Sequence, residues 1–169
     1  MQDVMMAARQ ARLADAPAIT AIYNQGIEDR VGTFETEPRT VADIEAWFAH
    51  AKAFVAVTDE AAGVVGYAVA HPYADRSCYA GIGAFSVYVR RDQRGCGVGR
   101  VAMTALVDAA RQAGLWKLVS RVFPENRASL NLMAWSGFRE VGVYEKHGKL
   151  DGVWRDCVIA ERMIRQNLD

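Results

Sequence analysis

The amino-acid sequence predicts a single α/β domain in which helices cover both faces of a mixed sheet. Its 169 residues match the size of one domain. No linker-like change of composition, low-complexity tract or internal repeat divides residues 1–169. Strand and helix patterns alternate along the chain, arranged as hairpins and one strand–helix–strand crossover. Hairpins give antiparallel neighbours and the crossover gives a parallel pair, so a mixed sheet is expected.

The first third of the chain predicts one strand and two helices. Residues 8–13 form the expected strand. Asp15 is placed as the N-cap of a helix that ends at Gly26, where a C-terminal glycine belongs. After a polar loop, Thr40 and Asp43 resemble a capping box with the shorter acid, which predicts that a second helix begins there.

The rest of the chain predicts a hairpin, a crossover and two closing strands. The hairpin joins residues 54–57 to 64–70, and an apolar strand rich in β-branched and aromatic residues follows at 84–89. A helix with one apolar face is expected over 98–113, ended by Gly114. The other expected elements are a strand at 115–123, a helix at 126–135, and strands at 141–144 and 158–163.

Charge and cysteine content exclude several functional classes. Lys and Arg together number 20, as do Asp and Glu, so the formal net charge is zero. This balance argues against a dedicated binder of nucleic acid or of an anionic membrane. Cys78, Cys96 and Cys157 form no C-x-x-C pair or zinc-spaced cluster, so neither a disulfide framework nor a metal site is expected. With no secretory signal pattern and no apolar run near the ~20 residues of a membrane span, a cytoplasmic protein is expected.

A glycine-rich turn lies between the strand at 84–89 and the helix at 98–113. It reads Arg94-Gly95-Cys96-Gly97-Val98-Gly99-Arg100. Glycines let the backbone approach a ligand closely, and the free amides of a helix start form an anion site. Four arginines in this segment would concentrate positive charge there: Arg90, Arg91, Arg94 and Arg100.

The glycine-rich turn has alternative interpretations. It is also compatible with a plain glycine-rich connection whose arginines are only solvated. A dinucleotide-binding fingerprint fits poorly, because the glycine spacing differs and no acid ends the following strand at 119–121. A Walker A loop is excluded, because no Gly-Lys-Ser/Thr occurs.

The segment from Arg94 to Arg100 resembles the Q/R-x-x-G-x-G/A motif of the GNAT acetyltransferases, and the resemblance extends over nearly the whole chain. The pieces most similar to the phosphinothricin and methionine sulfoximine N-acetyltransferase branch are Ile22-Tyr23-Asn24, Thr33-Phe34-Glu35-Thr36, Ser86-Val87-Tyr88-Val89, Asn126-x-x-Ser129-Leu130 and Trp154-x-Asp156. The stretch 123–156 is most similar to arsinothricin-resistance members. The resemblance implies a mostly antiparallel sheet with a splayed central strand pair.

The resemblance also implies acetyl-CoA as co-substrate and positions for its binding. The backbone of Val87, Tyr88 and Val89 would pair with the pantetheine arm. The loop amides from Gly95 to Arg100 would hold the pyrophosphate, and Asn126 and Ser129 would lie beside the pantetheine. For Asn126 and Ser129, ordinary helix-start hydrogen bonding is an alternative that stays open.

The implied second substrate is a small glutamate-like amino acid with a phosphinate, sulfoximine or arsinate group. Arg76 would bind its anionic group, with Tyr79 beside it, and Phe34 would form an aromatic wall. The alternatives are a surface position for Arg76 and a packing role for Phe34. The loop 146–151 with His147 would approach the active site of the other subunit of a homodimer, or be an exposed hairpin tip.

Two positions depart from the family pattern. Ala84 stands where this branch has a glutamate, and Met133 stands where it has a tyrosine or histidine. Neither side chain transfers protons, so the general base is unassigned. Three explanations stay open: a base elsewhere, catalysis by positioning alone, or lost turnover. The candidate bases, acting through water, are Glu28, Asp29, Glu35 and His71.

The main hypothesis is therefore an acetyl-CoA-dependent N-acetyltransferase that modifies the α-amine of such an amino acid by direct transfer. A backbone N–H near Val87 would polarise the thioester carbonyl. A covalent route through Cys96 is disfavoured, because that residue belongs to the phosphate loop. The alternative is a non-catalytic acyl-CoA-binding module, motivated by Ala84 and Met133.

Overall fold

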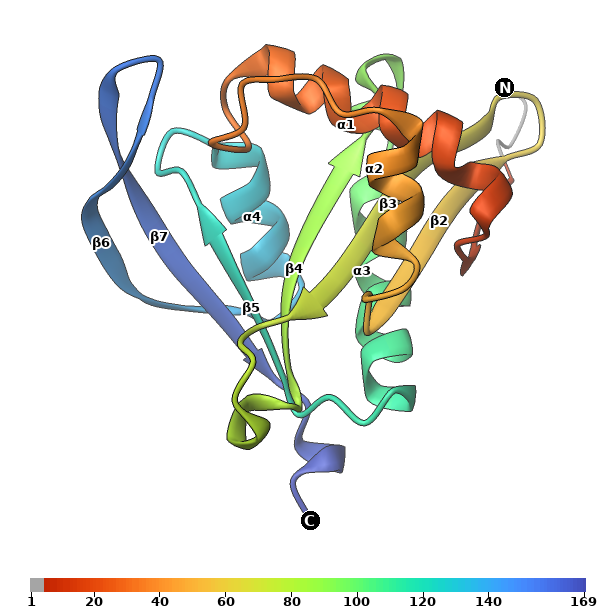
Figure 1. The fold of residues 1–169 in the computed structure, drawn as a ribbon. Coiled ribbons are helices and arrows are strands. Elements are labelled where there is room, and N and C mark those ends of the chain that lie inside the picture. Colours follow the sequence, from red (N-terminus) through yellow and green to blue (C-terminus); the bar gives the residue numbers. More distant parts are fainter. Residues whose placement is uncertain (1–4) are drawn as a thin grey trace.

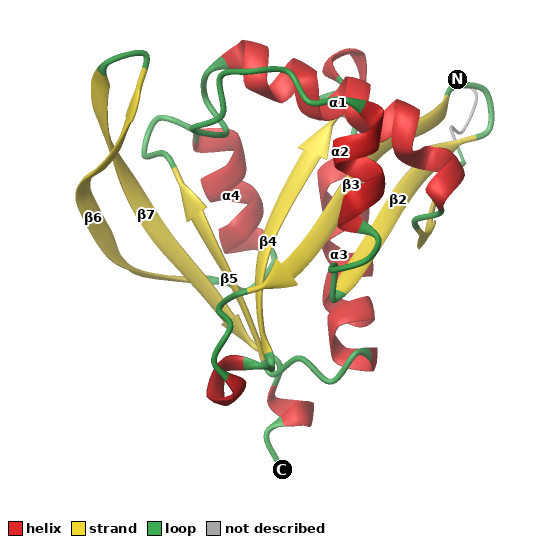
Figure 2. Ribbon diagram, viewed as in Figure 1, coloured by secondary structure: helices red, strands yellow, loops and turns green. Residues whose placement is uncertain are grey.

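The computed structural model describes residues 5–169, which form one seven-stranded sheet with helices on both faces (Figures 1 and 2). The strands are β1 Met6–Gln10, β2 Ala53–Asp59, β3 Gly63–Pro72, β4 Ile82–Val89, β5 Lys117–Val122, β6 Arg139–Leu150 and β7 Val153–Met163. The helices are α1 Ala16–Asp29, α2 Val41–Trp47, α3 Val98–Gln112 and α4 Arg127–Trp135. The strand order is β1-β2-β3-β4-β5-β7-β6. The predicted mixed α/β sheet is confirmed.

The centre of the sheet is a fork between β4 and β5, the one parallel pair in the described part of the chain. The two strands pair over three positions, ending with Ala84 opposite Val119. Beyond that point they diverge, as Figure 1 shows. One edge of β4 from Phe85 to Val89 consequently has no neighbouring strand. A single hydrogen bond crosses the start of the gap, where the Ser120 hydroxyl donates to the Phe85 carbonyl at 3.2 Å. The expected splayed strand pair is present.

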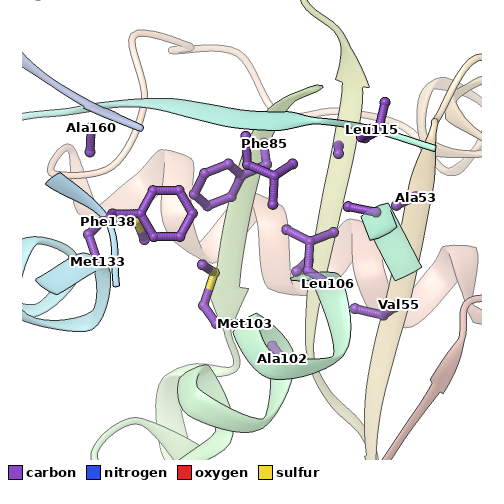
Figure 3. Packing of buried hydrophobic residues seen from close by; sticks show 14 of the residues in the cluster. Ala53, Val55, Phe85, Ala102, Met103, Leu106, Leu115, Met133, Phe138 and Ala160 are labelled. Carbon is purple, nitrogen blue, oxygen red and sulfur yellow. The ribbon is translucent and has the colours of Figure 1, made fainter. Parts of the chain in front are cut away.

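Alternation along the strands divides the core into two layers. On β2, Val55 and Val57 pack with α3, whereas Phe54 and Ala56 pack with α1 and α2. Figure 3 shows the first layer, in which Phe85 lies beside Phe138 with ring centroids 5.1 Å apart. The fork is thus held from both faces of the sheet.

In the second layer, the predicted end of the first helix at Gly26 is wrong. Helix α1 continues past this residue to Asp29 and ends with Arg30 in the left-handed region at φ 58°. Gly26 is small because the Tyr88 ring packs against it. A Cβ there would lie 2.5 Å from Tyr88 Cε1. Close helix-to-strand approach, rather than helix termination, explains the glycine.

The strand bounds at both ends of the chain also differ from expectation. Strand β1 ends at Gln10, because Asp15 accepts hydrogen bonds from the Arg9 guanidinium and the Arg12 amide and closes a tight turn there. The C-terminal hairpin is far longer than 141–144 and 158–163, since β6 and β7 continue to a turn at Asp151–Gly152. The predicted loop 146–151 is therefore wrong: those residues belong to β6, apart from Asp151 in the turn. The sequence of this part of β6 is largely exposed and polar, so it lacks the alternation of apolar and polar residues that would have predicted a strand.

Several local signals were interpreted correctly. Thr40 and Asp43 form a reciprocal capping box at the start of α2. The hairpin of β2 and β3 is present, and Gly114 follows α3 with φ +80°. Among residues 5–169, no helix is both long and apolar enough to cross a membrane.

Candidate active site

A cleft of about 1180 Å³ opens at the fork. Its walls come from the loop after α1, the diverging ends of β4 and β5, the glycine-rich turn, α4 and the bulged part of β6. Segments far apart in the sequence therefore meet where the sheet is split.

The glycine-rich turn presents backbone rather than side chains to this cleft. Gly95 and Gly97 have φ values of +78° and +89°, which favour glycine. Gly97 is the N-cap of α3 and offers no capping side chain. The amides of Val98 and Gly99, in the first helical turn, have no intrahelical acceptor. They and the helix dipole form a donor set suited to a diphosphate.

The side chains of the same turn lie in different surroundings. Gly95, Gly97, Gly99, Arg94 and Arg100 all line the cleft. The Val98 side chain is buried in the α3 layer, and Val98 itself is outside the cleft lining, so contact of its amide with a ligand stays a prediction. Cys96 is exposed, and its side chain is outside the cleft lining.

The expected concentration of positive charge at the turn is largely neutralised. Arg90 pairs with Asp92 at 2.7 Å, and Arg94 pairs with Asp29 at 2.6 Å. Arg91 contacts both Asp29 and Glu28. The Arg100 guanidinium instead stacks 4.8 Å from the centre of the Trp135 ring. The donors that this turn leaves free for an anion are therefore chiefly backbone amides.

These pairs also bear on two candidate bases. Burial raises the pKa of the Asp29 carboxyl, but hydrogen bonds from Arg91 and Arg94 outweigh it, so the pKa is lowered overall. A carboxylate with a lowered pKa is a weaker base. Glu35 lines the cleft but pairs with Arg39 at 2.8 Å, and Glu28 is outside the lining.

Strand β4 supplies the central wall through Val87, Tyr88 and Val89. Its free edge is the expected surface for a pantetheine arm. Tyr88 is held rigidly: its ring stacks on Tyr67 at 5.7 Å, and its hydroxyl donates to the Gly32 carbonyl. Burial raises the pKa of Tyr88 far above its ordinary value, so it stays protonated.

Asn126 and Ser129 both line the cleft at the start of α4. Asn126 is the N-cap, and its side-chain oxygen accepts a hydrogen bond from the Ser129 amide at 3.2 Å. The helix-start interpretation is confirmed for this bond. Both residues also line the cleft, where they could contact a ligand. That contact stays a prediction.

Phe34 lines the cleft on the side of β5 and β6. Its ring meets the Phe123 ring edge-to-face at 4.8 Å, and a Cβ on Gly148 would lie 2.9 Å from it. Phe34 therefore both packs the loop onto β5 and β6 and presents an aromatic wall. The two interpretations of Phe34, as a packing residue and as an aromatic wall of the cleft, are therefore compatible.

Arg76 and Tyr79 lie on a short 3-10 turn beside the cleft, outside its lining. The Arg76 guanidinium stands 5.8 Å from the Tyr79 ring centre. Tyr79 in turn contacts Tyr73, whose ring does reach the cleft. Binding of an anion by Arg76 stays a prediction.

The two departures from the family pattern have clear structural settings. Met133 is buried among the core residues in Figure 3 and lines the cleft with an apolar surface.

Ala84 is directly opposite His71 in the β3–β4 register, so both point to the same face. His71 lines the cleft and meets the Trp47 ring at 5.2 Å. Burial, and to a smaller extent the charge of His50, lower the pKa of His71.

Among the cleft residues that sequence reasoning did not predict, Arg121 is the charged one. Arg121 on β5 lines the cleft, and its Nη1 lies 3.5 Å from His147 Nε2. Strand alternation was the available signal, because Arg121 shares a face with Val119 and Phe123. Within residues 5–169, no group of three or more His, Cys, Asp or Glu is arranged to hold a metal ion.

Comparison with known proteins gives the family. Residues 19–138 match the acetyltransferase (GNAT) family. The chain is 36% identical over 165 residues to an L-methionine sulfoximine/L-methionine sulfone acetyltransferase of Pseudomonas aeruginosa, covering 95% of this chain and 94% of that protein. It is 35% identical over 161 residues to a phosphinothricin N-acetyltransferase of Alcaligenes faecalis, covering 92% and 81%.

A solved structure supports the same family assignment. A GNAT phosphinothricin acetyltransferase of Sinorhizobium meliloti, in complex with acetyl-CoA, superposes with a TM-score of 0.85 at 26% identity and covers 94% of this chain and 88% of that one. The free amides of the turn and the open edge of β4 fit a diphosphate and its pantetheine arm. The chain thus belongs to the GNAT acetyltransferases, and acetyl-CoA is its co-substrate.

Proposed function

We propose that this acetyltransferase modifies the α-amine of a small glutamate-like amino acid of the phosphinothricin or methionine sulfoximine type, and so confers resistance to it. The observation that carries the proposal is the two-sided cleft. Free amides lie on one side of the fork, and the Phe34 wall lies on the other. A donor and an amine entering from opposite sides would meet beside β4. The names of the relatives support this substrate class.

The residues of the cleft would divide the work as follows. The Gly95–Arg100 amides hold the diphosphate, and the Val87–Val89 edge orients the pantetheine arm. The Val87 N–H polarises the acyl carbonyl. Acetyl-CoA supplies an activated acetyl group, so the chain itself must align the amine and accept its proton.

His71 is the best-supported proton acceptor. Its cross-strand position opposite Ala84 brings an imidazole to the face from which the family glutamate is missing. Asp29 and Glu35 are engaged with arginines, whereas His71 contacts an aromatic ring. A lowered pKa keeps the imidazole neutral at pH 7, the form that accepts a proton.

The substrate class is tested by thiol release from acetyl-CoA in the presence of phosphinothricin, methionine sulfoximine and methionine sulfone. Turnover is expected with at least one of them, and none with its N-acetylated form, because the nucleophilic amine is then blocked. Calorimetric binding of CoA without turnover on any of these amino acids would contradict the proposal and favour a binding module.

The role of His71 is tested by His71→Ala, which should lower kcat about 100-fold, within the usual range for loss of a general base. The acid limb of the kcat/KM profile, expected below pH 6.5, should disappear, because it reports protonation of this imidazole. Introducing Ala84→Glu into His71→Ala should restore part of the rate.

The matched control is His50→Ala, since His50 is an exposed histidine outside the cleft lining. Its kcat is expected to stay within about twofold and its acid limb to be retained, moved slightly to higher pH because the charge of His50 lowers the pKa of His71. An unchanged acid limb in His71→Ala would reject His71 as the proton acceptor.

We further propose a homodimer that buries the C-terminal hairpin. Five large apolar side chains of β6 and β7 are about half exposed: Val141, Val143, Tyr144, Val153 and Trp154. Several exposed large apolar side chains on one hairpin are typical of a surface that another protein covers. Light scattering should give twice the chain mass of 18.6 kDa, and Val143→Asp should halve it. A wild-type monomer at micromolar concentration would contradict the proposal.

A further inference from the structure

The acceptor side of the cleft contains a basic pair that the proposed chemistry does not use. Arg121 extends from β5, and His147 extends from the irregular part of β6, where the pairing with β7 is interrupted between Tyr144 and Gly148. The Arg121 Nη1 and His147 Nε2 atoms lie 3.5 Å apart, and both residues line the cleft.

The bulge that carries His147 is built by specific contacts. Lys146 adopts a left-handed backbone at φ 45°, and its amide donates to the Asp156 carboxylate at 2.7 Å. Gly148 then passes against the Phe34 ring, so close that a Cβ would not fit. These two contacts hold His147 between them and direct it into the cleft.

The charge of Arg121 is not matched by a carboxylate in the described part of the chain. The nearby acids have partners of their own: Asp156 binds the Lys146 amide, and Glu125 lies 4.0 Å from Arg155. Three arginines near the glycine-rich turn, in contrast, are each paired with an acid. Arg121 is therefore a cation that faces the cleft, and within residues 5–169 its side chain has a polar contact with His147 only.

The location of the basic pair suits the far end of an amino-acid substrate. Val119 is paired with Ala84, which is opposite His71, so the proposed function places the reacting amine beside these three residues. Arg121 follows two residues later on the same face, about 7 Å along the strand. The Phe34 and Phe123 rings lie beside it and would cover an apolar stem.

We propose that Arg121 and His147 form the subsite for an oxoanion at the end of the substrate side chain, such as a phosphinate or carboxylate. The inference rests on the proposed function and deepens it, because it assigns a preference for anionic over neutral side chains. It also places the anion within the cleft, whereas Arg76 is outside the cleft lining. A bidentate guanidinium contact gives the strongest part of such a site.

The test compares one substrate that has an anionic side chain with one that has a neutral side chain. Arg121→Gln should raise the KM for phosphinothricin at least tenfold and change the KM for methionine sulfone less than twofold. His147→Gln should raise the first KM three- to tenfold. The KM for acetyl-CoA should be unchanged in both variants, because neither residue belongs to the glycine-rich turn or to the free edge of β4.

Arg165→Gln is the matched control, since Arg165 is exposed near the C-terminus and outside the cleft lining. Arg76→Gln, measured in parallel, tests the competing anchor. An equal rise of both KM values in Arg121→Gln, or a selective rise in Arg76→Gln alone, would overturn the assignment.

Calorimetry of phosphinothricin binding to the CoA-loaded protein separates the two proposals. If the wild type binds the amino acid and Arg121→Gln weakens that binding at least tenfold, the subsite stands even where acetyl transfer is absent. If acetyl transfer is present but Arg121→Gln binds phosphinothricin as tightly as wild type, only the subsite assignment fails.

Discussion

The divergence of two parallel strands is the constraint on which the rest of the molecule depends. Strands β4 and β5 share only three paired positions, and each then continues without the other. Unpaired backbone in a sheet is costly unless another group satisfies it. Here the gap opens into a cleft, so the unsatisfied edge of β4 becomes a binding surface. The structure around the fork holds it open, through the Tyr88 stack on one face and the Phe85–Phe138 contact on the other.

Charge in the cleft is arranged differently on its two sides. At the glycine-rich turn, most arginines are paired with Asp29, Glu28 or Asp92, and backbone amides remain as the donors. Such donors are fixed by the fold and require no side-chain ordering when a diphosphate binds. On the acceptor side, the Arg121 guanidinium, whose Nη1 lies 3.5 Å from His147 Nε2, provides side-chain charge instead. Under the proposed function, the co-substrate shared by the family would be held by backbone donors, and the more variable amine substrate by side chains.

Much of the fold followed from local sequence signals, and the errors have identifiable physical causes. The capping box at Thr40 and the glycine-rich turn were recognisable, because they depend on residues adjacent in sequence. Gly26 was misjudged because its neighbour, Tyr88, is distant in sequence. The length of β6 was missed because an exposed strand need not alternate. The pairing of the loop arginines with α1, and the meeting of Arg121 with His147, depend on the tertiary arrangement alone.

The most direct test of this account is a crystal structure of the protein with acetyl-CoA. The diphosphate should lie within hydrogen-bond distance of the amides at residues 97–100, with the pantetheine arm along β4 in the fork. The Asp29–Arg94 ion pair should persist, because amides rather than arginines carry the binding. A diphosphate held mainly by freed arginine side chains, or an arm that lies outside the β4–β5 gap, would contradict the account.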